Sequence, residues 1–494
     1  MSSNSNQTPQ KPRLSFWQIW NVSFGFLGVQ FGFALQNANA SRILSDLGAD
    51  LHSLSLFWLV APIMGLIIQP IVGSASDKTW NRLGRRNPYI LAGGIAAAIG
   101  MLLMPNSATL ASFITPLFFG AMMLALMDAS FNLAFQPFRA LVSDMVPAQQ
   151  RNIGYSIQSF LINIGAVFGS ILPFLLTNVI GLENTAETGQ VAPSVIWAFY
   201  IGASVMLGSV LWTVFRTKEY KPGTNGLAEL EKQNSEQTIT EKLSGFLSLM
   251  KTMPTTMKQL AVVQFFSWFA LFIMWVYTMP AIAQHIWGIE AKWFDPDYLA
   301  TVGSVPEHIA LAKGSAGDWV GIIFAAYSLF AAIASLFMAK VATAIGRKLT
   351  YSLSLLAGAI GYLSIMFLQN PEITLVNLGI TQISVPQGAV SLFLPMIGVG
   401  MAWAAILAMP YAILAGSLPV KQTGVYMGIF NFTIAAPQII SGIFAGWILT
   451  AVFDNQAIYI IMLAGASMAF AALSVYFVKD GVEQPSTVEQ AKAA

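Results

Sequence analysis

Residues 54–88 have the sequence LSLFWLVAPIMGLIIQPIVGSASDKTWNRLGRRNP, in which a long apolar run is followed by a short basic segment. The apolar part, 54–76, contains no charged residue, and it is long enough for a helix to cross the roughly 30 Å hydrocarbon core of a bilayer. The segment 77–88 then holds four Lys and Arg residues. This combination predicts a membrane-spanning helix that ends on the cytoplasmic side, where basic loops are retained.

The same pattern recurs along the whole chain of 494 residues, which is 56% hydrophobic and only 9% charged. A soluble chain carries roughly a quarter charged residues, so this composition excludes a soluble enzyme. We predict an all-α membrane protein with twelve spans, at residues 17–38, 54–76, 89–105, 111–137, 153–180, 194–215, 259–284, 318–340, 349–369, 388–415, 424–450 and 455–478.

The positions of Lys and Arg indicate the orientation of these spans. With a cytoplasmic N-terminus, 21 of the 24 Lys and Arg residues fall in cytoplasmic segments, and only Arg42, Lys292 and Lys313 fall in outer loops. We therefore expect both termini to be cytoplasmic. Separately from the charge pattern, we expect the protein to lie in a bacterial inner membrane. Residues 1–15 are polar, so we expect the first span to be retained rather than cleaved as part of a signal peptide.

The spans divide into two groups of six. We predict a cytoplasmic tail, an N-terminal six-helix half, a polar linker that includes an amphipathic run, a C-terminal six-helix half and a second tail, at 1–16, 17–215, 216–258, 259–478 and 479–494. A weak internal repeat supports this division, because Gly84-Arg85-Arg86 follows span 2 and Gly346-Arg347-Lys348 follows span 8. Two related halves joined by a linker are typical of transporters that bind substrate between the halves.

Several other classes of site are excluded by composition. The chain has no cysteine, and its three histidines form no cluster with the spacing of metal ligands. The net charge of +2 is too small to indicate a nucleic-acid partner. We therefore expect no metal and no cofactor, and we expect the lipid bilayer, a small solute and a proton to be the partners of a monomeric chain.

Asp128 is the one acidic residue that these assignments leave inside a span, because all the others, Asp318 among them, fall in predicted loops or tails. A charged, unpaired carboxylate at that depth costs about 2.5–3.5 kcal/mol, so it must face a cavity, find a partner or take up a proton. We interpret Asp128 as a proton-coupling and substrate-binding group. The alternative is a helix-packing aspartate that stays protonated.

Asn132 and Gln136 follow Asp128 at spacings of four and eight, so the three side chains share one helix face. Arg139 is near the same face, about three turns further along. Arg139 either attracts substrate near an inner gate or extends its charge to the membrane edge. These residues predict a polar stripe on an otherwise apolar helix.

Uncharged polar and aromatic residues in other spans are further candidates for the lining of a cavity. Amides can donate and accept hydrogen bonds, and aromatic rings pack on the C–H faces of sugars, so the set fits a neutral solute rich in hydroxyl groups. An isolated amide or tryptophan in a span can equally be a packing or interface residue. The candidates are Gln36, Asn37, Gln158, Gln264 and Trp268.

Charged residues at the predicted cytoplasmic ends of the spans could form ion pairs that close the inner face and break when it opens. The simpler interpretation is that they only set the orientation of the helices. We predict a cytoplasmic gate from Asp77, Arg85, Arg86, Asp144 and Arg347.

Two segments resemble a known family. The pattern Gly73-x-x-Ser76-Asp77…Gly84-Arg85-Arg86-Asn87-Pro88-Tyr89 resembles the loop between helices 2 and 3 of the major facilitator superfamily, in its glycoside–pentoside–hexuronide branch, especially plant sucrose transporters and their bacterial relatives. The segment Asp128…Pro137-x-Arg139-Ala140-Leu141-x-x-Asp144 is similar to helix 4 of those sucrose carriers. The resemblance implies that Asp128 couples protons and contacts sugar, and that Arg139 is needed for transport.

These observations predict a transporter rather than an enzyme. The leading hypothesis is proton-coupled symport of a disaccharide, sucrose or a maltose-like glucoside, by alternating access. Sodium-coupled melibiose carriers have extra aspartates in helix 2, and span 2 here has no acid before Asp77, which favours protons. The alternatives are a sodium-coupled glycoside symporter, a carrier of another neutral solute, or a membrane-embedded enzyme or receptor, for which no catalytic cluster or sensor domain is visible.

Overall fold

The computed structural model describes residues 11–187, 189–224, 253–377, 379, 381–415 and 423–479. The predicted linker and both predicted tails lie largely outside these residues, as does the amphipathic run. In chain order the N-terminal half has α1 (Phe16–Asp46), α2 (Ser53–Trp58), α3 (Val60–Lys78), α4 (Asn87–Leu103), α5 (Ser107–Leu110), α6 (Pro116–Met145), α7 (Arg151–Asn178) and α8 (Pro193–Arg216).

The C-terminal half carries a small hairpin as well as helices. Its elements are α10 (Thr255–His285), α11 (Pro296–Val302), α12 (Glu307–Ile345), α13 (Arg347–Ser364), β1 (Ile373–Asn377), β2 (Gln382–Pro386), α14 (Gln387–Ser391), α15 (Phe393–Ala415), α16 (Thr423–Ala451) and α17 (Ala457–Ser474). The strands pair antiparallel, with Ile373 opposite Pro386 and Asn377 opposite Gln382. Short 3-10 turns complete the fold at Met104–Asn106, Ala148–Gln150, Ala291–Phe294, Ile365–Phe367 and Val475–Phe477.

Local sequence explains where the principal helices begin and end. Ser15 caps α1 in a reciprocal arrangement with Gln18, and Thr115 caps α6 by accepting the N–H of Phe118. Such side-chain oxygens satisfy backbone donors that have no partner in the first turn. The helix α6 ends at Met145, just before Val146-Pro147, as expected for a residue that precedes proline.

Eleven helical segments within the described residues are long and apolar enough to cross a membrane. They correspond to predicted spans 2 to 12. The helix α1 has 31 residues but is not among them, because glutamine, asparagine and serine lower its hydropathy. It nevertheless packs along α7 and α8 inside the N-terminal half. The described residues therefore form a multi-pass helical membrane protein, in which the first predicted span, at α1, stays a prediction.

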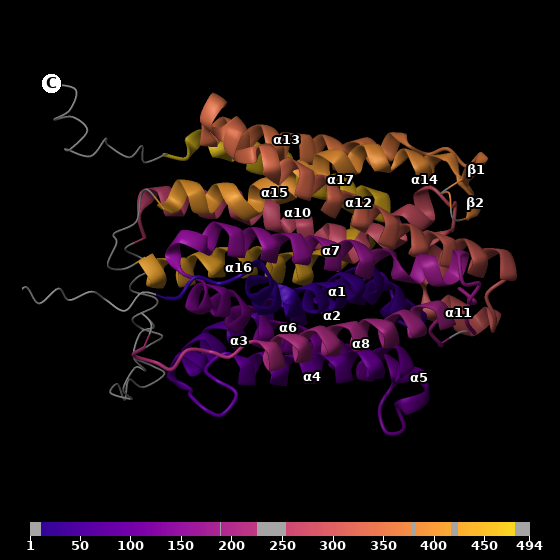
Figure 1. The fold of residues 1–494 in the computed structure, drawn as a ribbon. Coiled ribbons are helices and arrows are strands. Elements are labelled where there is room, and N and C mark those ends of the chain that lie inside the picture. The colour runs from indigo at the N-terminus through magenta and orange to yellow at the C-terminus, as the bar shows by residue number, and fades with distance from the viewer. Residues whose placement is uncertain are drawn as a thin grey trace, which may run out of the picture.

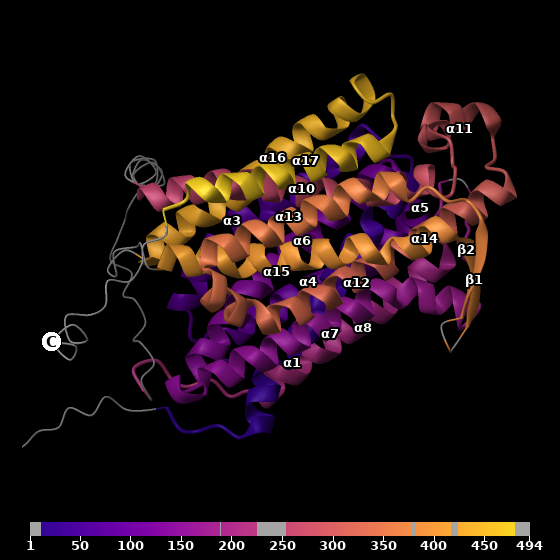
Figure 2. The same ribbon diagram turned by 90° about the horizontal axis from the view of Figure 1, so that it is seen from above.

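The long helices run side by side in two groups, α1–α8 and α10–α17 (Figure 1). The hairpin and α11 lie at one end of the bundle (Figures 1 and 2), and we call this the Arg42 end. The opposite end, where α3 meets α4, is called the Asp77 end. Both limits of the described chain are at the Asp77 end, where Lys11 donates to the carbonyl of Ser143 and Lys479 donates its N–H to Gln259.

The two halves are in contact toward the Arg42 end. Ser41 donates to the carbonyl of Val276 at 2.8 Å, and Gly446 donates its N–H to Ser55 at 3.2 Å. The Tyr277 hydroxyl donates to the carbonyl of Leu51 at 3.2 Å. Helices α7 and α12 also pack together across the boundary. The structure is therefore a conformation in which the halves are closed against each other at the Arg42 end.

Three sequence-based expectations about this end are wrong. The helix α1 continues to Asp46, and α12 begins at Glu307, so both enter segments that were predicted as outer loops. The fold is also not purely helical, because the hairpin occupies the segment between predicted spans 9 and 10. Hydropathy misses the extra helical turns because they carry polar residues, and several of these, such as Arg42 and Asp318, are buried against protein.

Candidate functional site

Asp128 lies at the contact between α6 and α1. Its side chain is 1% exposed, so it is turned toward the protein rather than toward lipid. Gln36 donates an amide N–H to Asp128 Oδ1 at 2.8 Å, while Oδ2 is buried and has no hydrogen-bond partner among the described residues. No ion pair to a basic side chain occupies this carboxyl group within the described part of the chain. It can therefore change its protonation without breaking a salt bridge.

Within the polar stripe predicted on α6, Gln69 of α3 joins the side chains of Asn132 and Gln136. Asn132 donates to the carbonyl of Asp128 at 2.8 Å and accepts from Gln69 at 2.6 Å. Gln136 donates to Gln69 at 2.9 Å. Gln69 thus joins two predicted residues, although it was absent from the predicted site. The only signal for it in the sequence was a single amide within apolar span 2.

The predicted amides are buried with atoms that lack protein partners. Gln158 on α7 is 6% exposed, and Gln264 on α10 is fully buried. The atoms without a hydrogen-bond partner among the described residues include Asp128 Oδ2, Gln36 Oε1, Gln158 Nε2 and Gln264 Nε2. Buried polar groups are nearly always hydrogen-bonded, so orphaned atoms on four predicted site residues suggest positions where substrate or water binds.

Aromatic rings gather around Gln264 in the C-terminal half. Trp268 donates its indole N–H to Gln264 at 2.9 Å, and its ring lies 6.3 Å from Trp275 and 5.9 Å from Trp403 of α15. Trp275 in turn contacts the hydroxyl of Tyr327 on α12 at 3.4 Å. Only Trp268 of these rings was in the predicted site. Trp275 lies two turns further along the same helix, whereas Trp403 and Tyr327 come from spans far apart in the sequence.

Asn37 and Arg139 are not joined to the Asp128 network. Asn37 on α1 is half-buried, and no hydrogen bond of its side chain is resolved within the described residues. Arg139 on α6 is exposed. The hydrogen-bonded part of the predicted stripe therefore ends at Gln136.

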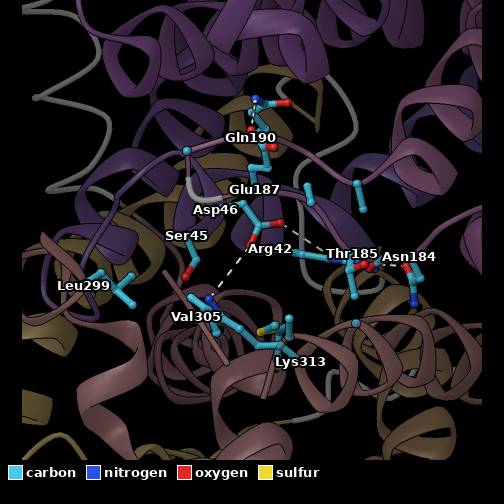
Figure 3. Close-up of a pocket in the computed structure, with 16 residues that line it drawn as sticks. Arg42, Ser45, Asp46, Asn184, Thr185, Glu187, Gln190, Leu299, Val305 and Lys313 are labelled. Atoms are coloured by element: carbon cyan, nitrogen blue, oxygen red, sulfur yellow. Dashed lines mark hydrogen bonds and ion pairs between the residues drawn. The ribbon is translucent and has the colours of Figure 1, made fainter. Parts of the chain in front are cut away.

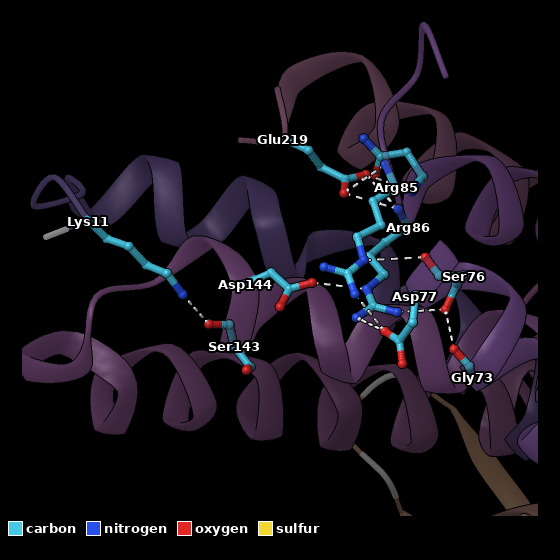
Figure 4. A network of polar contacts seen from close by, with 10 residues as sticks. Lys11, Gly73, Ser76, Asp77, Arg85, Arg86, Ser143, Asp144 and Glu219 are labelled. Carbon is cyan, nitrogen blue, oxygen red and sulfur yellow. Dashed lines mark hydrogen bonds and ion pairs between the residues drawn. The ribbon is translucent and has the colours of Figure 1, made fainter. Parts of the chain in front are cut away.

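Four of the five predicted gate residues meet at the Asp77 end (Figure 4). Arg86 binds Asp77 at 2.6 Å and Asp144 at 2.9 Å, and Arg85 binds Asp77 at 3.0 Å. Burial lowers the pKa of the Arg86 guanidinium, but the two carboxylates outweigh that effect and raise the pKa overall. All four residues belong to the N-terminal half, so these ion pairs lie within one half rather than between the two.

Arg347, the fifth predicted gate residue, is not brought into this cluster. It donates to the carbonyl of Ala412 at 2.7 Å, within the C-terminal half. This contact lies between α13 and α15 of one half, apart from the four residues that meet at the Asp77 end.

Glu219, which follows α8, clamps the start of α4. Its carboxylate accepts the backbone N–H groups of Arg85, Arg86 and Asn87 at 2.8–3.0 Å (Figure 4). These donors would otherwise lack partners at a helix N-terminus. Burial raises the pKa of Glu219, and the three backbone donors oppose the shift without cancelling it. No local signal in the sequence indicates this contact.

A second charged cluster lies between the halves at the Arg42 end. Arg42 of α1 and Asp318 of α12 are 3% and 4% exposed and form an ion pair at 3.4 Å. The expectation that both lie in outer loops, leaving Asp128 as the one acid within a span, is therefore wrong. Asp46 and Lys313 are neighbours of this pair. The Lys313 Nζ atom lies 3.9 Å from Asp46 Oδ1 (Figure 3).

A pocket adjoins this second cluster and is lined from both halves, by residues that include Arg42, Asp46, Asn184, Glu187 and Lys313 (Figure 3). A smaller apolar cavity lies inside the C-terminal half, lined by residues that include Met274, Phe324, Tyr362 and Met396. Neither includes Asp128. Within the described residues, no group of three or more acidic or histidine side chains is arranged to hold a metal ion.

Comparison with known sequences identifies the family. The sequence model of the Major Facilitator Superfamily matches residues 22–295 and 297–493. The chain belongs to the major facilitator superfamily. This confirms the resemblance noted in the two motif-bearing segments, and the relatives of the chain agree with the sucrose-transporter branch.

Three curated relatives illustrate that agreement. The sucrose transport protein SUC4 of Arabidopsis thaliana is 24% identical over 468 residues, which cover 90% of this chain and 86% of that protein. The general alpha-glucoside permease of Schizosaccharomyces pombe is 24% identical, over 55% of this chain and 49% of the permease. Proton-associated sugar transporter A of Mus musculus is 30% identical, but the match spans only 33% of this chain and 22% of that protein. The chain thus spans less than half the length of the permease and of the mouse protein.

Solved structures support the fold. The nucleoside transporter NupG is similar with a TM-score of 0.58 and 15% identity, over 94% of this chain and 100% of that chain. A proton-dependent oligopeptide transporter is similar with a TM-score of 0.63 and 15% identity, over 94% and 98% of the two chains. These relatives and neighbours are transporters rather than enzymes.

Proposed function

We propose that this protein is a proton-coupled sugar symporter that takes up a disaccharide, sucrose or a maltose-like glucoside, by alternating access. In this proposal α1 crosses the membrane as well and brings the number of spans to twelve. The Asp77 end is cytoplasmic, and the membrane is a bacterial inner membrane. The 21 basic residues that fall in predicted cytoplasmic segments support that orientation. The similarity to sucrose, alpha-glucoside and proton-associated sugar transporters supports the choice of substrate and ion.

The single observation that carries the proposal is the state of Asp128. This carboxyl group is buried between α1 and α6, its nearest polar partner is the neutral Gln36, and one of its oxygens has no partner among the described residues. A buried carboxylate without a cation is costly, so uptake of a proton relieves the cost. Such a group favours binding a proton and a solute together over binding either alone.

The two halves contribute different chemistry to sugar recognition in this proposal. In the N-terminal half, Asp128, Asn132 and Gln136 offer donors and acceptors to hydroxyl groups, with Gln69 holding the two amides in position. In the C-terminal half, Trp268 and its neighbouring indole rings offer apolar faces, and Gln264 Nε2 is a free donor among the described residues. A sugar ring has polar edges and an apolar face, which matches this division.

The test is uptake of labelled sucrose and maltose into proteoliposomes, with and without an inward proton gradient. We expect Asp128→Asn to abolish accumulation against a sugar gradient, because an amide cannot carry the proton, while sugar exchange without net accumulation persists. Asp297→Asn, at an exposed position near the start of α11, is the matched control and should accumulate sugar normally. Accumulation by Asp128→Asn would refute the coupling role. Uptake that needs sodium but no proton gradient would favour the sodium-coupled alternative.

A further inference from the structure

We propose that Arg42 and Asp318 form an outer latch, an ion pair that holds the two halves together at the Arg42 end and must break each time that end opens. The proposal rests on alternating access, as in the proposed function, but not on the identity of the substrate. The two residues are 276 positions apart in the chain and come from different halves. A rocking motion of one half against the other must therefore separate them.

The burial and partners of the pair show that it is built into the interface. Arg42 also donates to the carbonyl of Asn184 at 2.9 Å and to its side-chain oxygen at 2.8 Å. Asn178 donates to the second carboxylate oxygen of Asp318 at 3.4 Å. A buried ion pair is stable only when its remaining hydrogen-bonding positions are filled, and here α7 and the segment after it fill them.

Small residues on α12 let this contact form. Gly314, Gly317, Asp318 and Gly321 follow one another at helical spacing and face the N-terminal half. A Cβ atom at Gly317 would lie 2.8 Å from Arg42 Cδ, and one at Gly314 would lie 2.7 Å from the carbonyl oxygen of Asn184. A Cβ at Gly321 would overlap the carbonyl oxygen of Ser170. This face of α12 is therefore shaped for close approach to the other half in the closed state.

The latch is energetically suited to switching. While the Arg42 end is closed, the charges compensate each other out of water. When the halves part, both charges reach solvent, and hydration replaces the lost pair. The pair therefore contributes to the closed state without making the open state inaccessible. Asp318→Asn leaves Arg42 with only its longer acidic contact, to Asp46 at 3.9 Å, and Arg42→Gln leaves Asp318 without a basic partner among the described residues, so each change weakens the closed state. Single substitutions should consequently favour opening.

Opening can be measured without any transport assay, because the chain has no native cysteine. Ser55→Cys places a thiol in the contact between α2 and α16, where Ser55 is fully buried and accepts the N–H of Gly446 across the halves. Its rate of reaction with a membrane-impermeant maleimide, on protein in nanodiscs, reports separation at the Arg42 end. Ser384→Cys, on the exposed edge of the hairpin, is the matched control for reagent access.

We expect Asp318→Asn and Arg42→Gln each to raise the labelling rate of Ser55→Cys about five-fold or more, as a shift in the equilibrium toward the open state. The two changes together should raise it far less than the product of the single effects, because a pair that is already broken cannot be broken again. The labelling rate at Ser384→Cys should stay constant throughout.

Two results would overturn the latch. One is independent effects of the two substitutions on labelling, which would show that Arg42 and Asp318 do not act as a pair. The other is a loss of thermal stability without faster labelling, which would show a purely structural ion pair. Size-exclusion chromatography identifies any variant that fails to fold, and in that case the double variant, which leaves no uncompensated charge, provides the comparison. Because no sugar is used, failure of the latch is distinguishable from failure of the proposed substrate.

Discussion

Arg42 and Arg86 lie at opposite ends of the bundle, and each is buried among acidic side chains. Arg42 binds Asp318 across the boundary between the halves, whereas Arg86 binds Asp77 and Asp144 within its own half. Rigid-body motion of the halves would leave the second set of contacts intact but break the first. Two clusters of the same composition can therefore have different roles, and the location of the partners decides which cluster responds to opening and closing.

The largest effect on transport is expected from Gly321→Leu, which would sharpen the comparison by blocking closure at the Arg42 end. The new side chain would meet the backbone of α7 at Ser170, and overpacking costs about 1–3 kcal/mol, which lowers the closed population by roughly 5-fold to 100-fold. We expect sugar uptake to fall about five-fold or more and Ser55→Cys to label faster.

The control is Gly208→Leu on α8, where an added Cβ meets nothing within 4 Å. Normal uptake by Gly208→Leu together with impaired uptake by Gly321→Leu would support a steric effect of contact between the halves. Normal uptake by both would contradict the close approach of α12 to α7 during transport.

The next prediction tests whether the ion pairs at the Asp77 end stabilise one half without affecting the contact between the two halves. Arg86→Gln leaves Asp77 and Asp144 without their shared partner, which should lower the free energy of unfolding by about 2–4 kcal/mol, since Asp77 stays partly solvated. Thermal unfolding in detergent should show the loss, while labelling of Ser55→Cys should not change. Arg82→Gln, at an exposed position in the same loop, should have neither effect. Faster labelling of Ser55→Cys in the Arg86→Gln variant would show that the Asp77 end also controls the contact between the halves.

A smaller effect is expected from Gly84→Ala. Gly84 has a φ of +117°, and a Cβ there would lie 2.5 Å from a carboxylate oxygen of Glu219. The left-handed conformation costs an L-residue roughly 1–2 kcal/mol, and displacement of the clamp adds to this. Gly48→Ala is the matched control, because Gly48 has a φ of +103° and open space around its Cβ position. Equal losses of thermal stability in the two variants would show that the clamp contributes nothing.

The smallest effect concerns pH. Burial raises the pKa of Glu219, so its contribution to stability is fully present below the pKa of the unfolded chain and is lost as pH rises through the folded value. Glu219→Gln removes this dependence. The stability of the native chain relative to the Gln variant should therefore decrease as pH rises from about 4 upward, as measured by thermal unfolding across that range. A relative stability that increases with pH would show that the backbone donors dominate instead.

Sequence alone predicted the elements that depend on local composition. Spans 2 to 12 follow from hydropathy, and the network of Asp128, Asn132 and Gln136 follows from helical spacing. Both signals come from residues of a single helix, where periodicity fixes which side chains share a face.

The contacts that sequence could not predict join distant segments. Glu219 reaches Arg85 across 134 positions, and Arg42 reaches Asp318 across 276. Polar residues near the end of a span have the same hydropathy whether they face water or another helix, so the ion pair was assigned to loops. The predicted site held Trp268 but not Trp403 for a related reason, because spacing along one helix does not show which residues of a neighbouring helix it faces.

The position of Glu219 has a mechanical consequence for the connection between the halves. The carboxylate is fastened to the first turn of α4 only a few residues before the described N-terminal half ends at Thr224. Tension arriving along the chain from the C-terminal half would act first on this anchorage and on the whole α3–α4 corner, so that α8 would not be unwound from its end. The Glu219 contact would thus protect α8 from unwinding when the two halves move apart.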